Sequence, residues 1–254
     1  MSKGELGRVA AAVQARVPYL SCATDAPATD GWIGCAELVA DPALVRHEIE
    51  ATMPGRRTDD IQVAASLYVQ SYAYRVASLA VAAYALDLPS PSCEPDDLAV
   101  LVQRHRPARI AVLDPVCHRL DAPALAARLL DGHLRPFIAT VRESTRIGQR
   151  LLWGNVASAI ASIFGAVHSV GPYGDPAVRW RADLFHQAAE PWLGGLGEWS
   201  QLERPGAFGW YWNRTSCCLW YQTEGGWYCE DCSLHDRAEL EASRAAALVG
   251  SERS

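Results

Sequence analysis

The sequence predicts a mainly helical α+β protein with a small β element, in which a helical body carries a C-terminal hairpin. Half of its 254 residues are hydrophobic, which is enough for a compact core. Most of these residues recur at helical spacing, and the composition changes after residue 190 to a segment rich in Gly, Trp and Tyr. We therefore divide the chain into a helical body (1–190), a C-terminal region (191–242) and a flexible polar tail (243–254).

Caps and breaks mark the elements of the first half. Asp41 and Pro42 pair an N-cap with a proline at the first helical position, and Asp60 caps the longest apolar segment. That segment has almost no polar face, so we expect it to run through the centre of the core. The expected elements are helices over residues 4–20, 41–52 and 61–86, with a loop over 22–34.

The second half mixes short apolar runs with strong helical patterns. Residues 109–114 have the apolar run and the nearby prolines of a strand. Residues 134–141 either pair with that strand or begin the following helix, and Pro95 opens a short helix through residue 102. The other expected elements are helices over 121–130, 144–167 and 177–189, with a loop over 171–176.

The overall charge excludes one class of partner. A net charge of -6 and a pI near 5.6 argue against a nucleic-acid binder, which needs a basic face. The N-terminus lacks the apolar stretch of a secretory signal, and the long helix carries Gln70 and Arg75 at its middle, so we predict no transmembrane segment. We expect a cytoplasmic protein, in which thiols stay reduced and clustered cysteines indicate metal or redox chemistry.

Cysteines are concentrated near the C-terminus. Of the eight in the chain, four lie within one short segment, namely Cys217, Cys218, Cys229 and Cys232. The others, at positions 22, 35, 93 and 117, stand far apart. Aromatic residues flank Gly225-Gly226 in the middle of the segment, a pattern typical of a hairpin that would bring the four thiols together.

The spacing of these cysteines leaves more than one kind of site open. Structural zinc sites usually have two Cys-x2–4-Cys turns, and here only Cys229 and Cys232 make one. The adjacent Cys217 and Cys218 start in different directions, which suits the more distributed attachment points of a [2Fe–2S] cluster. Zinc, disulfide chemistry and inert cysteines all stay open on this evidence.

The cysteine motif also resembles that of a known family. Cys-Cys-x10-Cys-x2-Cys, preceded by Arg214-Thr-Ser and with Leu-Trp-Tyr after its first pair, resembles the cluster motif of the FhuF-like ferric siderophore reductases. Leu152-Trp-Gly-Asn-x-Ala-Ser is similar to the family's central helix motif, and Ala64-Ala-Ser-Leu-x-x-Gln-x-Tyr-Ala-x-Arg to its first long helix. The resemblance runs from about Trp32 to Ser233, and it departs from the family pattern at Ser233.

This resemblance implies that the four clustered cysteines ligate a [2Fe–2S] cluster and that the helical body binds a ferric siderophore, most often a hydroxamate. It implies a cytoplasmic oxidoreductase acting on metal ions, which receives an electron from a separate ferredoxin or flavin-dependent reductase and releases Fe(II). Hard oxygen ligands hold Fe(III) far better than Fe(II), so no catalytic group beyond the cluster is expected. Since uptake occurs at the membrane, peripheral contact with its inner face is compatible with this interpretation.

Four residues are candidates for substrate contact: Trp153, Asn155, Arg214 and Trp220. Three of them have a structural alternative. Asn155 could cap a kink after Gly154, and Arg214 could pair with Glu224 or Asp231. Trp220 and its aromatic neighbours could shield the cluster instead of docking a chelate. His235, three residues after Cys232, is a candidate substitute ligand or proton acceptor.

Two other functions stay open. One is a zinc-stabilised siderophore- or metabolite-binding protein without redox activity, and the other is a generic [2Fe–2S] electron carrier. The sequence has no phosphate loop, no nucleotide-binding glycine pattern and no Ser-His-Asp order. We therefore expect no internal flavin or NAD site.

Overall fold

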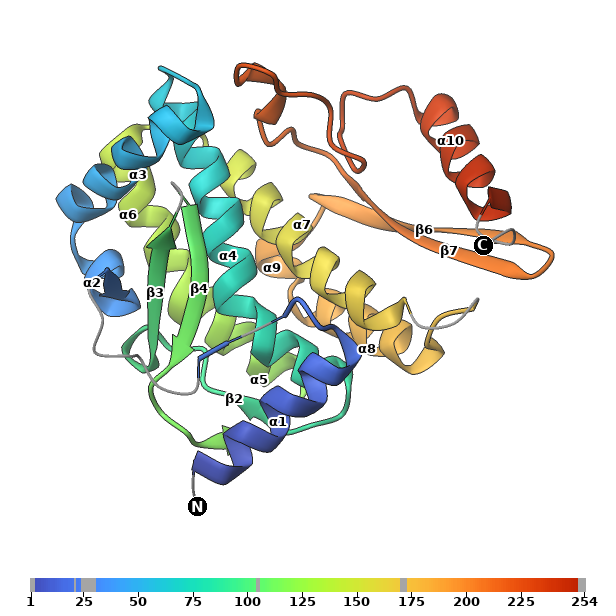
Figure 1. The fold of residues 1–254 in the computed structure, drawn as a ribbon, viewed down its shortest axis with the longest axis horizontal. Coiled ribbons are helices and arrows are strands. Elements are labelled where there is room, and N and C mark those ends of the chain that lie inside the picture. Colours follow the sequence, from blue (N-terminus) through green and yellow to red (C-terminus); the bar gives the residue numbers. More distant parts are fainter. Residues whose placement is uncertain (1–2, 21, 24–30, 104–105, 170–172, 251–254) are drawn as a thin grey trace.

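The computed structural model describes residues 3–20, 22–23, 31–103, 106–169 and 173–250. It confirms the mainly helical α+β class. Two long helices, α4 (Ile61–Ala85) and α7 (Gln149–His168), lie side by side through the centre of the molecule (Figure 1). Most of α4 is buried because its Ala, Leu, Val and Tyr side chains leave almost no polar face, as the sequence predicts.

Shorter helices surround this central pair. α3 (Pro42–Arg56) and α6 (Arg135–Thr145) pack on each other and on α4, and α8 (Pro176–Ala188) packs on both central helices. The remaining helices of the body are α1 (Lys3–Arg16), α2 (Cys35–Ala40), α5 (Ala122–Ala126), a wide π-type helix (Ala127–Leu134) and α9 (Glu190–Leu193). Aspartate side chains accept backbone N–H bonds at the starts of α3, α4, α5 and α8, namely Asp41, Asp60, Asp121 and Asp175.

Two small antiparallel sheets complete the body. The larger has the order β1 (Trp32–Gly34), β3 (Leu98–Gln103), β4 (Arg106–Val112), and β4 lies against α4 (Figure 1). The smaller pairs β2 (Ser90–Pro91) with β5 (Cys117–His118).

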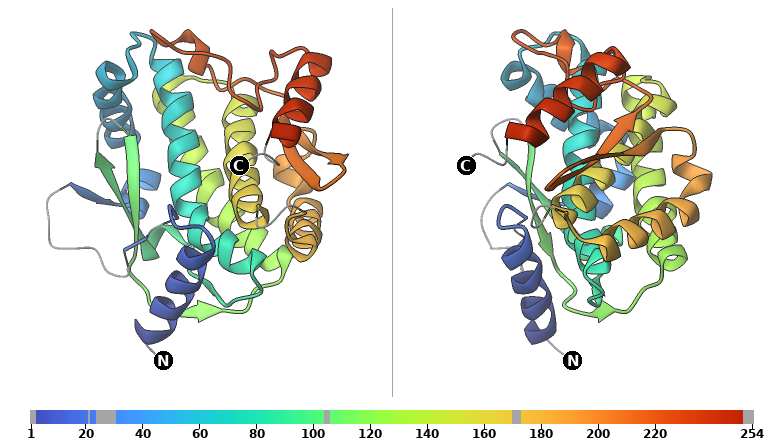
Figure 2. Two further views of the ribbon diagram at one scale, coloured as in Figure 1. Left: turned by 45° about the vertical axis from the view of Figure 1, so that its right-hand side comes forward. Right: turned by 90° about the vertical axis from the view of Figure 1, so that its right-hand side faces the viewer.

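The C-terminal region begins with a hairpin of its own. β6 (Gly197–Arg204) and β7 (Ala207–Arg214) pair along their full length and pack on α7. Their turn is Pro205-Gly206, where Gly206 has a φ of 79°, a conformation that favours glycine. Helix α10 (Arg237–Gly250) contacts both strands, and the cysteine segment connects β7 to α10 along the edge of the helical body (Figures 1 and 2).

The structure corrects several predicted elements. Residues 95–102 do not form a helix, because Pro95–Asp97 makes a single 3-10 turn and the valine- and leucine-rich β3 follows it between β1 and β4. Of the two alternatives for residues 134–141, the structure has the helical one. The helix expected from residue 144 begins at Gln149, because Arg146 adopts the left-handed conformation, with a φ of 58°, and ends α6.

The end of the chain also differs from expectation. α10 crosses the boundary at residue 242, so the segment predicted to be a tail is helical as far as Gly250. Residues 251–254, and parts of the loops expected over 22–34 and 171–176, lie outside the described residues.

Within the described ranges, one helix, α7, has the length and apolar composition of a membrane span, but 78% of its most apolar window is buried inside the protein.

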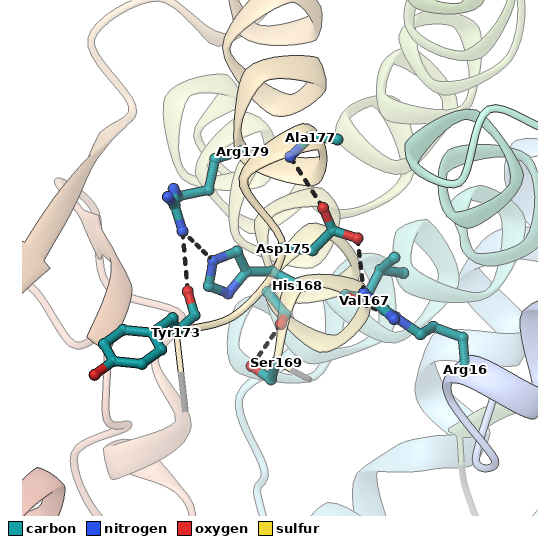
Figure 3. A network of polar contacts seen from close by, with 9 residues as sticks. Arg16, Val167, His168, Ser169, Tyr173, Asp175, Ala177 and Arg179 are labelled. Atoms are coloured by element: carbon teal, nitrogen blue, oxygen red, sulfur yellow. Dashed lines mark hydrogen bonds and ion pairs between the residues drawn. The ribbon is translucent and has the colours of Figure 1, made fainter. Parts of the chain in front are cut away.

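Polar contacts fix the C-terminal end of α7 (Figure 3). Arg16 donates to the carbonyl oxygen of Val167 and pairs with Asp175, both at 2.9 Å. Burial lowers the pKa of His168 to about 4, and the neutral ring accepts a hydrogen bond from Arg179 at 2.8 Å.

Candidate metal centre

The four clustered cysteines lie close together on the segment that follows β7. The sulfur atoms of Cys218 and Cys229 are 3.3 Å apart, and the pKa of Cys217, raised first by burial, is raised further by the neighbouring Cys232. Cys218 and Cys232 are buried, whereas Cys217 and Cys229 are partly exposed. The sulfurs are therefore arranged as two pairs at the surface of the helical body.

The local fold that brings them together is not the hairpin predicted over residues 219–228. Leu219 adopts the left-handed conformation, and a 3-10 turn (Trp220–Gln222) follows it directly. Gly226 lies so close to this turn that a Cβ there would be 2.0 Å from the carbonyl oxygen of Trp220. The compact turn, rather than paired strands, returns the chain to Cys229. The true hairpin lies upstream, where the Pro205-Gly206 turn joins β6 and β7.

The donor set of this site consists of four cysteine sulfurs. In a [2Fe–2S] cluster each iron takes two protein ligands, so four cysteines in two pairs supply the right donor set. The pairs here are Cys218 with Cys229 and Cys217 with Cys232.

The surroundings of the sulfurs favour negative charge at one of them. The pKa of Cys218 is lowered to about 6, first because the Cys229 thiol hydrogen-bonds to its thiolate, and further by the N–H of Trp220 and the guanidinium of Arg214. Burial raises the pKa of Cys217 to about 11. A thiolate is the form that binds metal, so Cys218 is the sulfur best prepared for ligation.

Arg214 is buried behind the cysteines and holds them to the helical body. Its Nη2 donates to the side-chain oxygen of Asn155 and its Nε to the carbonyl of Ser216, each at 2.5 Å. Asn155 donates to the backbone and hydroxyl oxygens of Ser66 at 2.8 Å, and the Ser66 hydroxyl donates to the carbonyl of Cys218 at 2.7 Å. A closed polar network therefore links α4, α7 and the cysteine segment.

This network decides between the alternatives for two candidates. In the described part of the chain Arg214 forms no ion pair, and its Nη1 has no hydrogen-bond partner, so the salt bridge considered with Glu224 or Asp231 is not formed. Asp231 accepts a hydrogen bond from Ser158 of α7 instead. Asn155 is fully buried and joins two elements rather than capping a kink.

Trp153 and Gly154 have packing positions on α7. Trp153 is buried in the hydrophobic core, and neither it nor Asn155 lines the cavity beside the cysteines. Gly154 faces the cysteine segment, and a Cβ at this position would be only 1.8 Å from the hydroxyl oxygen of Ser216. The absence of a side chain at residue 154 therefore lets the segment approach α7.

The aromatic residues divide into two groups. Trp210 and Trp212 of β7 are buried against α7 and α8, where Trp210 stacks on Trp199 with ring centroids 3.6 Å apart. Trp227 is 67% exposed and meets Trp220 edge to face, with ring centroids 5.7 Å apart. The hairpin aromatics thus build the core, while those of the cysteine segment are available to a ligand.

A cavity of about 430 Å³ opens beside this second group. Its lining includes Cys218, Cys229, Trp220 and Trp227, so one of the four predicted substrate residues, Trp220, lies in it. His235 lies outside it and has a structural contact, because its Nε2 is 2.9 Å from the carbonyl oxygen of Cys229.

The cavity also contains residues that the sequence analysis did not predict. Arg56, Arg75 and Arg106 line its wall, together with Tyr74. These residues come from the consecutive helices α3 and α4 and from β4, which follows later in the chain. Arg75 stands in the helix motif quoted above, and an arginine within an otherwise apolar helix was the one available signal.

Two known families match separate parts of the chain, one the helical body and the other the cysteine segment. Residues 66–192 match the family described as "Ferric iron reductase FhuF-like transporter". Residues 214–234 match the "FhuF 2Fe-2S C-terminal domain", and this range contains all four clustered cysteines. No individual curated protein gave a significant match. The first match includes most of α4 and all of α7, the helices to which the cysteine segment is tied.

Proposed function

Because the chain belongs to the FhuF-like ferric iron reductase family and carries its [2Fe–2S] domain, we propose that it reduces siderophore-bound Fe(III) by one electron and releases Fe(II). Cys217, Cys218, Cys229 and Cys232 are the proposed ligands of the cluster. The cluster, when bound, supplies one-electron transfer. The electron comes from a separate ferredoxin or flavin-dependent reductase in the cytoplasm, near the inner face of the membrane. The family resemblance supports these finer assignments.

One observation carries the proposal most directly. The sulfur atoms of Cys218 and Cys229 lie together in the wall of an open cavity whose size suits a small ligand. A chelate held there would contact the residues that carry the cluster, with no protein layer between them.

The chemistry demands little of the surrounding side chains. Reduction changes Fe(III) to Fe(II), and the oxygen ligands of the chelator bind Fe(II) much more weakly, so the metal leaves without cleavage of any covalent bond. The residues of the cavity have to hold and orient the chelate. The helical body, residues 1–190, is the proposed siderophore-binding part.

A direct experiment tests this function. The protein is reduced with dithionite without air, separated from excess reductant, and mixed with ferric siderophores, hydroxamates included, in the presence of a chromophoric Fe(II) chelator. We expect Fe(II) to appear in step with reoxidation of the cluster absorbance. Release from none of the siderophores would refute the reductase and leave a generic electron carrier. A colourless protein with stoichiometric zinc would instead indicate the zinc-stabilised binder.

Two cysteine variants test the assignment of the ligands. Cys229→Ser is expected to abolish or strongly change the visible spectrum of the cluster. Cys93→Ser is the matched control, because Cys93 is fully buried in the helical core and burial raises the pKa of its thiol to about 12. An unchanged spectrum in the Cys229 variant would contradict the proposed ligand set.

A further inference from the structure

The cavity beside the cysteines carries a concentrated positive charge. Arg56 stands at the end of α3, Arg75 in the middle of α4 and Arg106 at the start of β4, and all three line the cavity. The cavity is positively charged although the protein as a whole has a net charge of -6. Guanidinium groups stay protonated in proteins, so the cavity holds three positive charges.

No carboxylate in the described part of the chain neutralises these charges; the negative charge in the same cavity wall is that of the Cys218 thiolate, or of the cluster that Cys218 and Cys229 would bind. No aspartate or glutamate of the described residues lines the cavity, and none of the three arginines forms an ion pair there. Among the described residues, Arg56 donates to the hydroxyl of Ser71, at 3.1 Å. The pKa values of Arg56 and Arg75 are lowered by burial first and also by the like charge of Arg106. A bound anion would stabilise the charged form of both guanidinium groups and so raise their pKa values again.

Aromatic rings accompany the arginines. The guanidinium of Arg56 lies 5.9 Å from the ring centroid of Trp220, and that of Arg75 lies 5.3 Å from the ring centroid of Tyr74. The exposed ring of Trp227 stands edge to face against Trp220. The cavity therefore offers both cationic and flat apolar surface to the same ligand.

We propose that this arginine cavity selects ferric chelates with a net negative charge and aromatic chelating groups, the catecholate class, over neutral trihydroxamates. The proposal rests on the proposed ferric-siderophore reductase function and specifies its substrate. Each hydroxamate loses one proton on binding, so three of them leave the Fe(III) chelate neutral. Each catecholate loses two, so three leave a trianion whose rings can lie on Trp220 and Trp227.

The dimensions favour a small chelate over an acidic electron-donor protein. A cavity of about 430 Å³ falls in the usual range for small-molecule sites. A protein partner would need a much broader contact surface, on the order of 1,000 Å² or more. One face of a metal chelate would fit here, next to Cys218 and Cys229.

Redox-silent gallium(III) chelates test the selection as a binding measurement, with the oxidised holoprotein and tryptophan fluorescence as the readout. We expect the gallium tricatecholate to bind at least about tenfold more tightly than a neutral gallium trihydroxamate. Only the tricatecholate should weaken markedly as salt is raised, because ionic screening acts on the charged ligand.

Single-residue variants test whether the cavity arginines cause the preference for the tricatecholate. Arg75→Gln and Arg106→Gln should each weaken tricatecholate binding about tenfold and leave trihydroxamate binding within about twofold. Arg75→Lys keeps the charge and should recover part of the loss. Arg204→Gln, at the exposed end of β6 and outside the cavity, removes the same charge and should change neither ligand. The cluster spectrum shows whether each variant is folded.

The outcomes separate this inference from the function itself. Equal binding of the two gallium chelates, or equal losses for both in the arginine variants, overturns the charge selection even if hydroxamates are reduced. If the variants bind both chelates normally but accept electrons more slowly from a reduced ferredoxin, the cavity is a donor-docking site and the proposal is wrong. Tight tricatecholate binding without Fe(II) release from any ferric siderophore would instead refute the reductase function.

Discussion

Arg214 is a buried cation that the described residues of the protein leave without a carboxylate partner. Two of its nitrogens hold Asn155 and Ser216, and the third has no hydrogen-bond partner in the same part of the chain. Burying an unpaired charge is costly unless something nearby gains from it. The gain here is at the cysteines, since the guanidinium favours negative charge on Cys218 and Cys229.

We predict that Arg214→Gln makes the reduction potential of the cluster more negative, on the order of 50 mV, because reduction adds negative charge beside a lost cation. Arg214→Lys keeps the charge but not the planar contacts, so its potential should stay near that of the wild type while the cluster becomes less stable. Potentials from spectroscopic redox titration provide the measurement. Equal potentials for the Gln variant and the wild type would show that Arg214 is only structural.

His133 is a second buried polar residue, and its contacts define its protonation. Its Nδ1 is 2.7 Å from the carbonyl oxygen of Cys93, which can only accept, so Nδ1 carries the proton. Its Nε2 therefore accepts from the hydroxyl of Tyr72, also at 2.7 Å. Burial lowers the pKa of His133 to about 4, and the neutral ring satisfies both partners.

The lowered pKa of His133 predicts that the folded protein becomes less stable as the pH falls. Between about pH 6.5 and 4 the unfolded chain protonates His133 and the folded protein does not, so stability decreases as pH falls through this range, by up to about 3 kcal/mol. His133→Gln can keep both hydrogen bonds but does not titrate, so its urea midpoint should vary less over this pH range. His168, whose pKa is lowered similarly, remains in both proteins as background. Parallel pH profiles would contradict the assignment.

At the scale of elements, the sequence predicted helices better than strands. Asp41 and Asp60 cap helices where the residue pattern indicated, because a capping side chain acts within two or three residues of its own position. β3 was wrongly predicted as helix, since only pairing with β1 and β4 makes its apolar run a strand. The hairpin was misplaced because aromatic residues flank both Gly206 and Gly225, and only the first turn has two strands that pair.

The contact between α7 and the cysteine segment gives a prediction at this scale. Gly154→Ala would place a methyl group 1.8 Å from the Ser216 hydroxyl oxygen, so we expect a loss of about 1–3 kcal/mol and a lower cluster content. Gly165→Ala is a matched control on the same helix, because its Cβ would meet nothing within 4 Å. That variant should be neutral or more stable by up to about 1 kcal/mol.

Denaturation curves and iron-to-protein ratios of both variants check this prediction. Adding Ser216→Ala to Gly154→Ala removes the clashing oxygen and should restore part of the loss. Equal behaviour of the two glycine variants would mean that the segment does not depend on close approach to α7.

At the scale of the whole molecule, the metal site was predictable and the ligand cavity was not. The four cysteines lie within sixteen residues of one another, so their spacing alone indicated a shared site. The cavity arginines come from α3, α4 and β4, and only the tertiary fold brings them beside Trp220. Asn155 was singled out for substrate contact, but its position between Ser66 and Arg214 could not be read from a pattern on one helix.

The difference in packing between the helical body and the cysteine segment predicts how the molecule responds to loss of the cluster. The body has an extensive apolar core of its own around α4 and α7. Residues 215–236 instead have short turns, and hydrogen bonds connect them to the rest of the protein, among them those of Cys218 with Ser66, Glu224 with Arg57 and Asp231 with Ser158. In the cluster-free Cys229→Ser variant we expect unchanged helical circular dichroism and unchanged amide exchange protection in α4 and α7. Exchange should accelerate in residues 215–236, and Cys93→Ser should show neither change. Loss of protection in α4 and α7 would mean instead that the cluster is required for the fold of the body, because the two parts would then unfold as one unit.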